Sequence, residues 1–194
     1  KLISKHYNLL QLDTGRIYRY VANIKITEPK KFNYQYLKKK INNLRISSLH
    51  NKKLLSDKVA IIASIIAKDK KIRKLVHAFQ LECAYNPPKN YNGSCLDGRD
   101  IGSVVVKDAD VKFYITANVK VRANRRYKEL KAKNKKITYK EVLKSIKKRD
   151  KSDKNRKISP LKKMKDMHLI NSSSESISTC FMKIKKIIDR KINN

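Results

Sequence analysis

Residues 96–106 read LDGRDIGSVVV, and the interpretation of the chain starts from this stretch. The protein has only four glycines, and two of them, Gly98 and Gly102, lie here on either side of an Arg-Asp pair. Glycine marks a sharp turn or a close approach of the backbone to a ligand. Arg99 and Asp100 can therefore present a cation and a hydrogen-bond acceptor to one bound molecule. The alternative is a surface turn that carries an ordinary ion pair.

The elements on both sides of this stretch alternate between strand and helix. Short apolar runs predict strands, and apolar residues at helical spacing predict helices. Asp69 is a candidate helix cap, and Thr138 with Glu141 forms a capping box. The expected strands are 9–12, 94–96, 111–115 and 168–170. The expected helices are 17–24, 32–44, 57–67, one after Asp69, 119–133, one after Thr138, and one opened by Ser174 with an inner stripe of Ile177, Cys180, Phe181, Ile184 and Ile188.

This alternation predicts an α/β fold, a parallel sheet with helices on both faces. Ligands of such folds bind at the carboxyl ends of the strands. The Asp-Thr-Gly turn at 13–15 and the stretch 97–102 both follow predicted strands. Both are therefore expected at that edge of the sheet.

The formal charge of +33 suggests nucleic acid or an anionic surface as a partner. A second explanation is a codon bias that enriches Lys, Asn and Ile, and leaves only four prolines and no tryptophan. In that case many lysines are solvated surface. The three cysteines and four histidines lack metal-ligand spacing, so neither a metal site nor a disulfide framework is expected, and each cysteine is expected to be a small buried side chain. Without a membrane span or signal peptide in the sequence, a soluble cytosolic protein is expected.

A second charged cluster, RDKSDKNR, occupies residues 149–156. Arg149, Asp153 and Arg156 lie at i, i+4 and i+7, so they share one face if the helix continues. Guanidinium groups suit phosphate oxygens, and a carboxylate accepts from sugar hydroxyls. With the arginines at 122, 125 and 126, the cluster suggests phosphoryl transfer. The alternative is an ordinary charged helix end.

Four motifs, in order, resemble those of bacterial cytidylate kinases, and the similarity runs from end to end. They are DTGRIYR at 13–19, LDGRDIGSVVV at 96–106, RANRR at 122–126 and RDKSDKNRKISPL at 149–161. The resemblance implies a P-loop NTPase-like fold of the nucleoside monophosphate kinase type. It also implies one domain over 1–194, with a short monophosphate-binding insert at about 25–68 and a lid at about 122–156.

The resemblance further implies a monomer that uses ATP with Mg²⁺ to phosphorylate CMP or dCMP. Arg19 and Arg99 would hold the acceptor phosphate, while Ser64, Arg73 and Asp100 would recognise the cytosine. Cytosine has an N4 donor beside two acceptors, so it needs an acceptor next to an arginine, and uracil would be disfavoured. The other implied residues are Asp13, Thr14, Arg149, Asp153 and Arg156 for CMP and Arg122 and Arg126 for ATP, with Arg99, Arg149 and Arg156 acting in catalysis.

Several features depart from the family pattern, including the short monophosphate-binding insert and Leu81, where relatives often have Arg. No glycine is followed by Lys, so the chain lacks a G-x-x-x-x-G-K-[ST] phosphate loop. We therefore expect a chain that lacks its first strand and P-loop and is inactive as it stands. Arg16 also replaces a small residue. The alternative function is a basic RNA-binding or ribosomal protein, which would bind RNA with a steep salt dependence, although no RNA-recognition motif is present.

Overall fold

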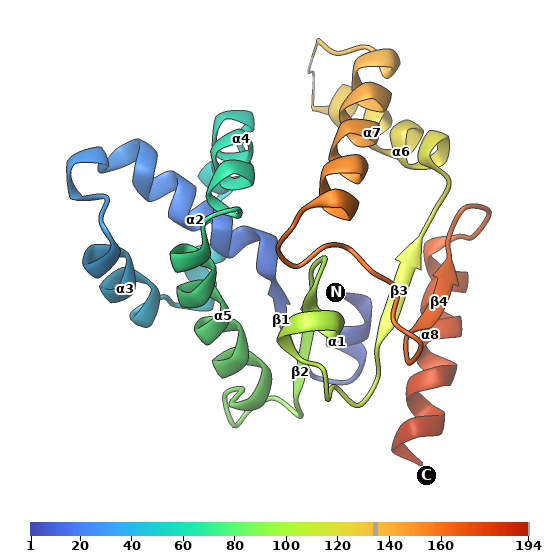
Figure 1. The fold of residues 1–194 in the computed structure, drawn as a ribbon. Coiled ribbons are helices and arrows are strands. Elements are labelled where there is room, and N and C mark those ends of the chain that lie inside the picture. Colours follow the sequence, from blue (N-terminus) through green and yellow to red (C-terminus); the bar gives the residue numbers. More distant parts are fainter. Residues whose placement is uncertain (134–135, 194) are drawn as a thin grey trace. The chain divides into compact units, whose positions relative to one another are not determined.

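The computed structural model describes residues 1–133 and 136–193, and it divides the chain into two compact units, Lys1–Ile101 and Gly102–Asn194. Each unit contains a two-stranded parallel sheet. β1 (Leu10–Asp13) pairs with β2 (Ser94–Asp97), and β3 (Phe113–Thr116) pairs with β4 (His168–Asn171) (Figure 1). The predicted class, α/β with parallel strands, is confirmed. Residues 134 and 135 of the expected lid region, and residue 194, lie outside the described part of the chain.

The first unit is built around the step from β1 directly into α2 (Thr14–Thr27). α2 packs against α4 (Asp57–Ile66) and fully buries Ile17 and Val21 (Figure 1). Two short 3-10 helices, η2 (Ile46–His50) and η3 (Lys52–Leu55), precede α4. The remaining elements are α1 (Leu2–His6), η1 (Pro29–Lys31), α3 (Tyr34–Asn42) and α5 (Lys70–Tyr85).

Helix α5 begins where its cap predicts. The Asp69 carboxylate accepts from the backbone N–H groups of Lys71 and Ile72, at 2.8 and 3.0 Å. This removes two of the unpaired donors of the first helical turn. The expected apolar face follows, with Leu75 and Val76 buried in the core of the unit.

The second unit contains α6 (Val119–Ala132) packed against α7 (Tyr139–Asn155). Ala123, Leu130 and Val142 form a buried cluster of these two helices, against which the half-buried Leu143 and Ile146 pack. The capping box of Thr138 and Glu141 is present at the start of α7. One turn of π-helix, η4 (Ile101–Val105), precedes β3, and α8 (Ile177–Ile192) follows β4.

Two expectations for the last helix were wrong. The cap of α8 is Ser176, whose hydroxyl accepts from the Thr179 N–H at 3.0 Å, and not Ser174. Ile177 is 78% exposed because it occupies the first helical position, so the inner stripe begins only at Cys180.

Burial of the three free cysteines differs. Cys83 is buried, and burial raises the pKa of its thiol to about 11, while Cys95 and Cys180 are half-buried. Within the described residues, no helix combines the length and apolarity that crossing a bilayer requires.

Candidate functional site

The carboxyl ends of β1 and β2 bring two aspartates together. Asp13 and Asp97 are register partners, and both follow apolar strand residues. The hydroxyl of Thr14 donates to the Asp97 carbonyl at 2.7 Å, so this buried side chain joins the start of α2 to the end of β2. A Cβ on Gly98 would lie 2.5 Å from the Thr14 Oγ1 atom. The glycine is therefore needed for this close approach.

Asp97 lies close to a second negative charge at this edge of the sheet. Desolvation by surrounding protein atoms, together with the negative charge of Asp13, raises the pKa of Asp97 above its ordinary value. Arg16 partly compensates, because its Nε lies 3.3 Å from the Asp13 Oδ2 atom. A cavity of about 230 Å³ is lined by both carboxylates, Arg16 and His50. Sequence reasoning placed neither Asp97 nor Arg16 among the site residues, although both flank predicted ones.

Two arginines of α2 hold the segment that contains η2 and η3. Arg16 Nη1 donates to the Leu49 carbonyl at 2.9 Å. Arg19 Nη1, from the next turn of the helix, donates to the Leu54 carbonyl at 3.0 Å. Arg19, predicted to hold a phosphate, thus also fixes the chain that enters α4.

Arg73 and Asp100, both expected at the cytosine, contact each other directly. Arg73 Nη2 lies 2.5 Å from Asp100 Oδ2, and the two side chains are 13% and 10% exposed. The Arg73 guanidinium also donates to the Ala67 carbonyl at 3.2 Å and lies over the Tyr18 ring at 5.8 Å. These three contacts leave few side-chain conformations available to Arg73.

Ser64 and Arg99 are the other residues of this unit that were predicted to contact the acceptor nucleotide. Both are exposed. The Ser64 hydroxyl donates to the Ile61 carbonyl of its own helix at 2.7 Å. A ligand that uses this hydroxyl as a donor must compete with that bond.

In the second unit, Arg122 makes a bidentate pair with Asp150. Its Nη1 and Nη2 atoms lie 3.0 and 2.6 Å from the two carboxylate oxygens, and its Nε donates to the Ala117 carbonyl at 2.9 Å. The hydrogen bond to Asp150 raises the pKa of Arg122. The pair therefore ties α6 to α7.

Arg126 contacts Glu129 one turn along α6, at 2.7 Å. Lys133 and Arg126 both bond to the Glu129 carboxylate and hold its pKa below the ordinary value. Arg126 is exposed, so its guanidinium is accessible to a ligand.

Arg156 does not share a helix face with Arg149 and Asp153, because the condition for this, a helix that continues through Arg156, is not met. Arg149 Nε lies 3.8 Å from Asp153 Oδ2 on α7. The helix ends at Asn155, and Arg156 has an extended backbone with ψ of 138°. Its Nε instead donates to the Ser159 carbonyl in the turn that follows.

These features define a class of protein. Arginines beside the carboxyl ends of parallel strands, with carboxylates able to accept from a base or a sugar, are suited to nucleoside phosphates. No group of three His, Cys, Asp or Glu side chains suited to a metal ion occurs within residues 1–133 and 136–193. The geometry is that of a nucleotide-binding α/β protein.

Comparisons with known proteins make the assignment specific. The sequence profile of the family described as cytidylate kinase matches residues 1–190. The cytidylate kinase of Clostridium botulinum (strain Okra / Type B1) is 39% identical over 98% of this chain and 90% of its own length. That of Clostridium tetani is 37% identical over 99% and 88%, and that of Bartonella tribocorum 40% over 96% and 86%. The chain belongs to the cytidylate kinase family, and the alternative of an RNA-binding or ribosomal protein is not supported.

Proposed function

We propose that this protein transfers the γ-phosphoryl group of ATP to CMP or dCMP, giving CDP or dCDP. The family assignment supports the reaction, and the Arg73–Asp100 pair is the observation that supports the base. Cytosine offers an N4 donor next to the N3 and O2 acceptors. A carboxylate beside a guanidinium matches that order, whereas uracil carries an acceptor at position 4.

The following residues are the proposed contacts of the acceptor nucleotide. Arg19 and Arg99 would bind its phosphate, and Ser64 would add a hydroxyl contact to the base. Arg149 and Asp153 would bind the sugar hydroxyls. Arg156 would act at the transferring phosphoryl group or the base, and Asp13 and Thr14 complete the proposed CMP contacts. Catalysis is then mainly positioning and charge neutralisation, with Arg99, Arg149 and Arg156 next to the reacting phosphates.

The carboxylates of Asp13 and Asp97 fit the Mg²⁺ that kinases of this family use with ATP. Mg²⁺ prefers oxygen ligands and is commonly held by one or two carboxylates together with substrate phosphates. Asp13 and Asp97 are register partners at the ends of β1 and β2, so two carboxylates are present at this edge. When bound, the ion would neutralise phosphate charge.

The donor nucleotide would lie beside α6. Arg122 and Arg126 would approach the ATP phosphates, and Arg122 would exchange part of its bidentate pair with Asp150 for them. The larger architecture that we propose is a single nucleoside monophosphate kinase domain of the P-loop type, its parallel sheet covered on both faces, with an insert at about 25–68 and a lid at about 122–156.

Initial rates with CMP, dCMP, UMP and AMP at saturating ATP and Mg²⁺ test this proposal, measured on a protein in which a G-x-x-x-x-G-K-[ST] phosphate loop precedes this chain. We expect CMP and dCMP to react at least about tenfold faster than the other two, since one unmatched buried polar contact costs about 1–3 kcal/mol. Equal rates on all four nucleotides would overturn the assignment of the base contacts.

A further inference from the structure

Lysines recur along α7 at intervals of four and three residues, the spacing of one helix face. At about 100° per residue they all lie within about 40° of one direction. At a rise of about 1.5 Å per residue, the row that they form is about 21 Å long. We call this set the α7 lysine row, and its members are Lys140, Lys144, Lys147, Lys151 and Lys154.

The side chains of the α7 lysine row are all exposed. Within residues 1–133 and 136–193, none of them forms an ion pair or a side-chain hydrogen bond. The apolar residues of the helix, Val142, Leu143 and Ile146, instead pack with α6. The row therefore occupies the face of α7 that the fold does not use.

The acidic residues of α7 do not neutralise the row, because each has another partner. Glu141 forms the capping box at the start of the helix. Asp150 binds the Arg122 guanidinium at 2.6 Å, and Asp153 lies 3.8 Å from Arg149. The positive charge of the row therefore faces solvent without a nearby carboxylate of its own helix.

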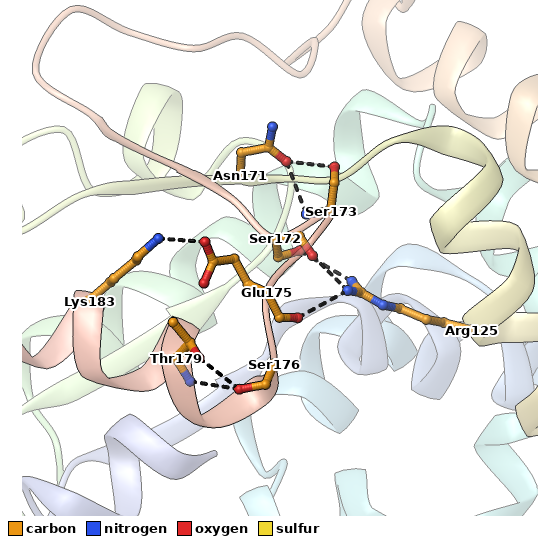
Figure 2. Close-up of polar contacts among 8 residues, drawn as sticks. All are labelled: Arg125, Asn171, Ser172, Ser173, Glu175, Ser176, Thr179 and Lys183. Carbon is orange, nitrogen blue, oxygen red and sulfur yellow. Dashed lines mark hydrogen bonds and ion pairs between the residues drawn. The ribbon is translucent and has the colours of Figure 1, made fainter.

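Other cations of the same unit do serve the fold. Figure 2 shows Arg125 of α6 donating to the carbonyls of Ser172 and Glu175, at 2.6 and 3.4 Å. The Glu175 carboxylate is in turn paired with Lys183 of α8, at 2.5 Å. Such contacts explain these two cations, whereas the α7 lysine row makes none.

The row also works against the stability of its own helix. Like charges four residues apart, such as Lys140 with Lys144 and Lys147 with Lys151, destabilise a helix. A polyanion bound along the row would remove this repulsion. Its binding is therefore favoured by the stability of α7 as well as by direct attraction.

A single strand of nucleic acid fits the row better than a membrane does. A strand carries regularly spaced phosphates, and lysines that neutralise them release counterions. A helix that binds a bilayer surface needs a free apolar face, and that of α7 is packed with α6. The aromatic ring of this helix, Tyr139, contacts Tyr127 edge-on with centroids 6.2 Å apart, so it offers no platform for a base.

We propose that the α7 lysine row binds single-stranded nucleic acid through its backbone phosphates, without reading the sequence. This surface is separate from the proposed nucleotide contacts, since Arg149 lies about 200° around the helix from Lys147. The proposal adds a partner to a member of the cytidylate kinase family and does not rest on the proposed kinase function.

The test compares two variants of the full chain that lose the same charge. The row variant replaces all members of the α7 lysine row with Gln, which has a helix propensity close to that of Lys. The control variant makes the same change at exposed helical lysines of the first unit that form no side-chain contact within the described residues. These are Lys5, Lys38, Lys39, Lys71 and Lys74.

Fluorescence anisotropy of a labelled oligouridylate, followed over a range of salt concentrations, gives the affinity and its salt dependence. Each phosphate neutralised on a single strand contributes about −0.7 to the slope of log K against log salt. We expect the row variant to lose up to about 3.5 of the slope and to bind at least about tenfold more weakly at about 0.1 M salt. The control should stay within about twofold of the wild type, and oligoadenylate should bind as oligouridylate does. Circular dichroism checks that both variants fold.

Three results would overturn the proposal. A wild type that binds no oligouridylate at about 0.1 M salt removes the partner. Equal losses in the row and control variants show that the net charge of +33, and not the row, attracts the strand. A wild type that binds vesicles of phosphatidylserine and phosphatidylcholine but not oligouridylate makes the partner a membrane instead.

Discussion

Arg73 and Asp100 are 27 residues apart in the sequence, yet their side chains meet at 2.5 Å, and both are largely buried. The first lies in α5 and the second follows β2, so the contact joins a helix to the end of a strand. Burying two charges carries a desolvation cost that their attraction only partly offsets. A gain in folding stability therefore does not explain why the protein buries this pair. The burial favours a role of the pair in ligand binding.

Replacing Asp100 with Asn should weaken CMP binding and moderately destabilise the protein. The change keeps the shape of the side chain but removes the carboxylate from Arg73. We expect the KM for CMP to rise by roughly 10- to 100-fold and the free energy of unfolding to fall by about 1–3 kcal/mol. Steady-state kinetics and thermal unfolding measure the two effects separately.

Asp166→Asn is the control for Asp100→Asn, because it removes an exposed carboxylate that pairs with Lys112 in the other unit. It should leave the KM for CMP unchanged. An Asp100→Asn variant with normal CMP kinetics would remove Asp100 from the site.

Replacing Asp97 with Asn should stabilise the protein at neutral pH. The folded state raises the pKa of Asp97, so it binds this proton more tightly than the unfolded state does. Stability is therefore lost as pH rises from the unfolded-state value, about 3.9, through the folded-state value, and the deficit is complete at pH 7. The Asn variant lacks this deficit. Its advantage in urea unfolding should be largest at pH 7 and disappear near pH 3.

The effect of Mg²⁺ on thermal stability can be measured for the same two proteins, the wild type and Asp97→Asn. A bound cation favours the Asp97 carboxylate, so Mg²⁺ should raise the melting temperature of the wild type more than that of Asp97→Asn. An Asn variant that is less stable at pH 7 would contradict the electrostatic account of this edge.

Alanine at Gly98 should be much less well tolerated than alanine at Gly102. A Cβ on Gly98 would lie 2.5 Å from Thr14 Oγ1 and 2.8 Å from Ile101 Cγ1. On Gly102 it would lie 3.0 Å from the Cδ of Lys112, a flexible side chain that can move. We expect Gly98→Ala to cost about 1–3 kcal/mol of stability and Gly102→Ala less than half of that, as measured by urea unfolding. Equal losses would show that the close approach of Thr14 does not restrict this position.

Glycine at Ser159 should stabilise the turn after α7. Ser159 has a φ of 50°, in the left-handed region that favours glycine. We expect Ser159→Gly to gain about 0.5–1 kcal/mol in urea unfolding. Ser152→Gly, inside α7, should instead lose about 0.5 kcal/mol. A loss at both positions would show that the Ser159 side chain outweighs its backbone strain.

The sequence predicted best where a local signal fixes an element. The Asp69 cap, the Thr138–Glu141 capping box and the apolar spacing of α4 each define a helix from within a few residues. The predicted strands were short. The turn residues that follow two of them nevertheless indicated that 13–15 and 97–102 lie at the same edge of a sheet. The expectation that Arg73 and Asp100 serve one base-binding site came from the family resemblance, because no local pattern links residues so far apart, and only the structure shows their direct contact.

The errors arose where tertiary contacts override local pattern. Helical spacing suggested that Arg156 lies on α7. The helix ends before this residue, and the Arg156 guanidinium donates to the Ser159 carbonyl. Ile177 fits an apolar stripe by spacing, yet a first helical position faces solvent here. Asp97 could not be assigned a role, since its surroundings depend on a strand partner that is distant in the sequence.

The affinity of the protein for CMP compared with UMP, measured by titration calorimetry, tests the central claim most directly. The two nucleotides share their sugar and phosphate, so the difference reports on the base contacts of Arg73 and Asp100. We predict that CMP binds at least about tenfold more tightly and that Asp100→Asn removes most of this preference. Equal affinities in the wild type, or a preference unchanged in Asp100→Asn, would contradict the account.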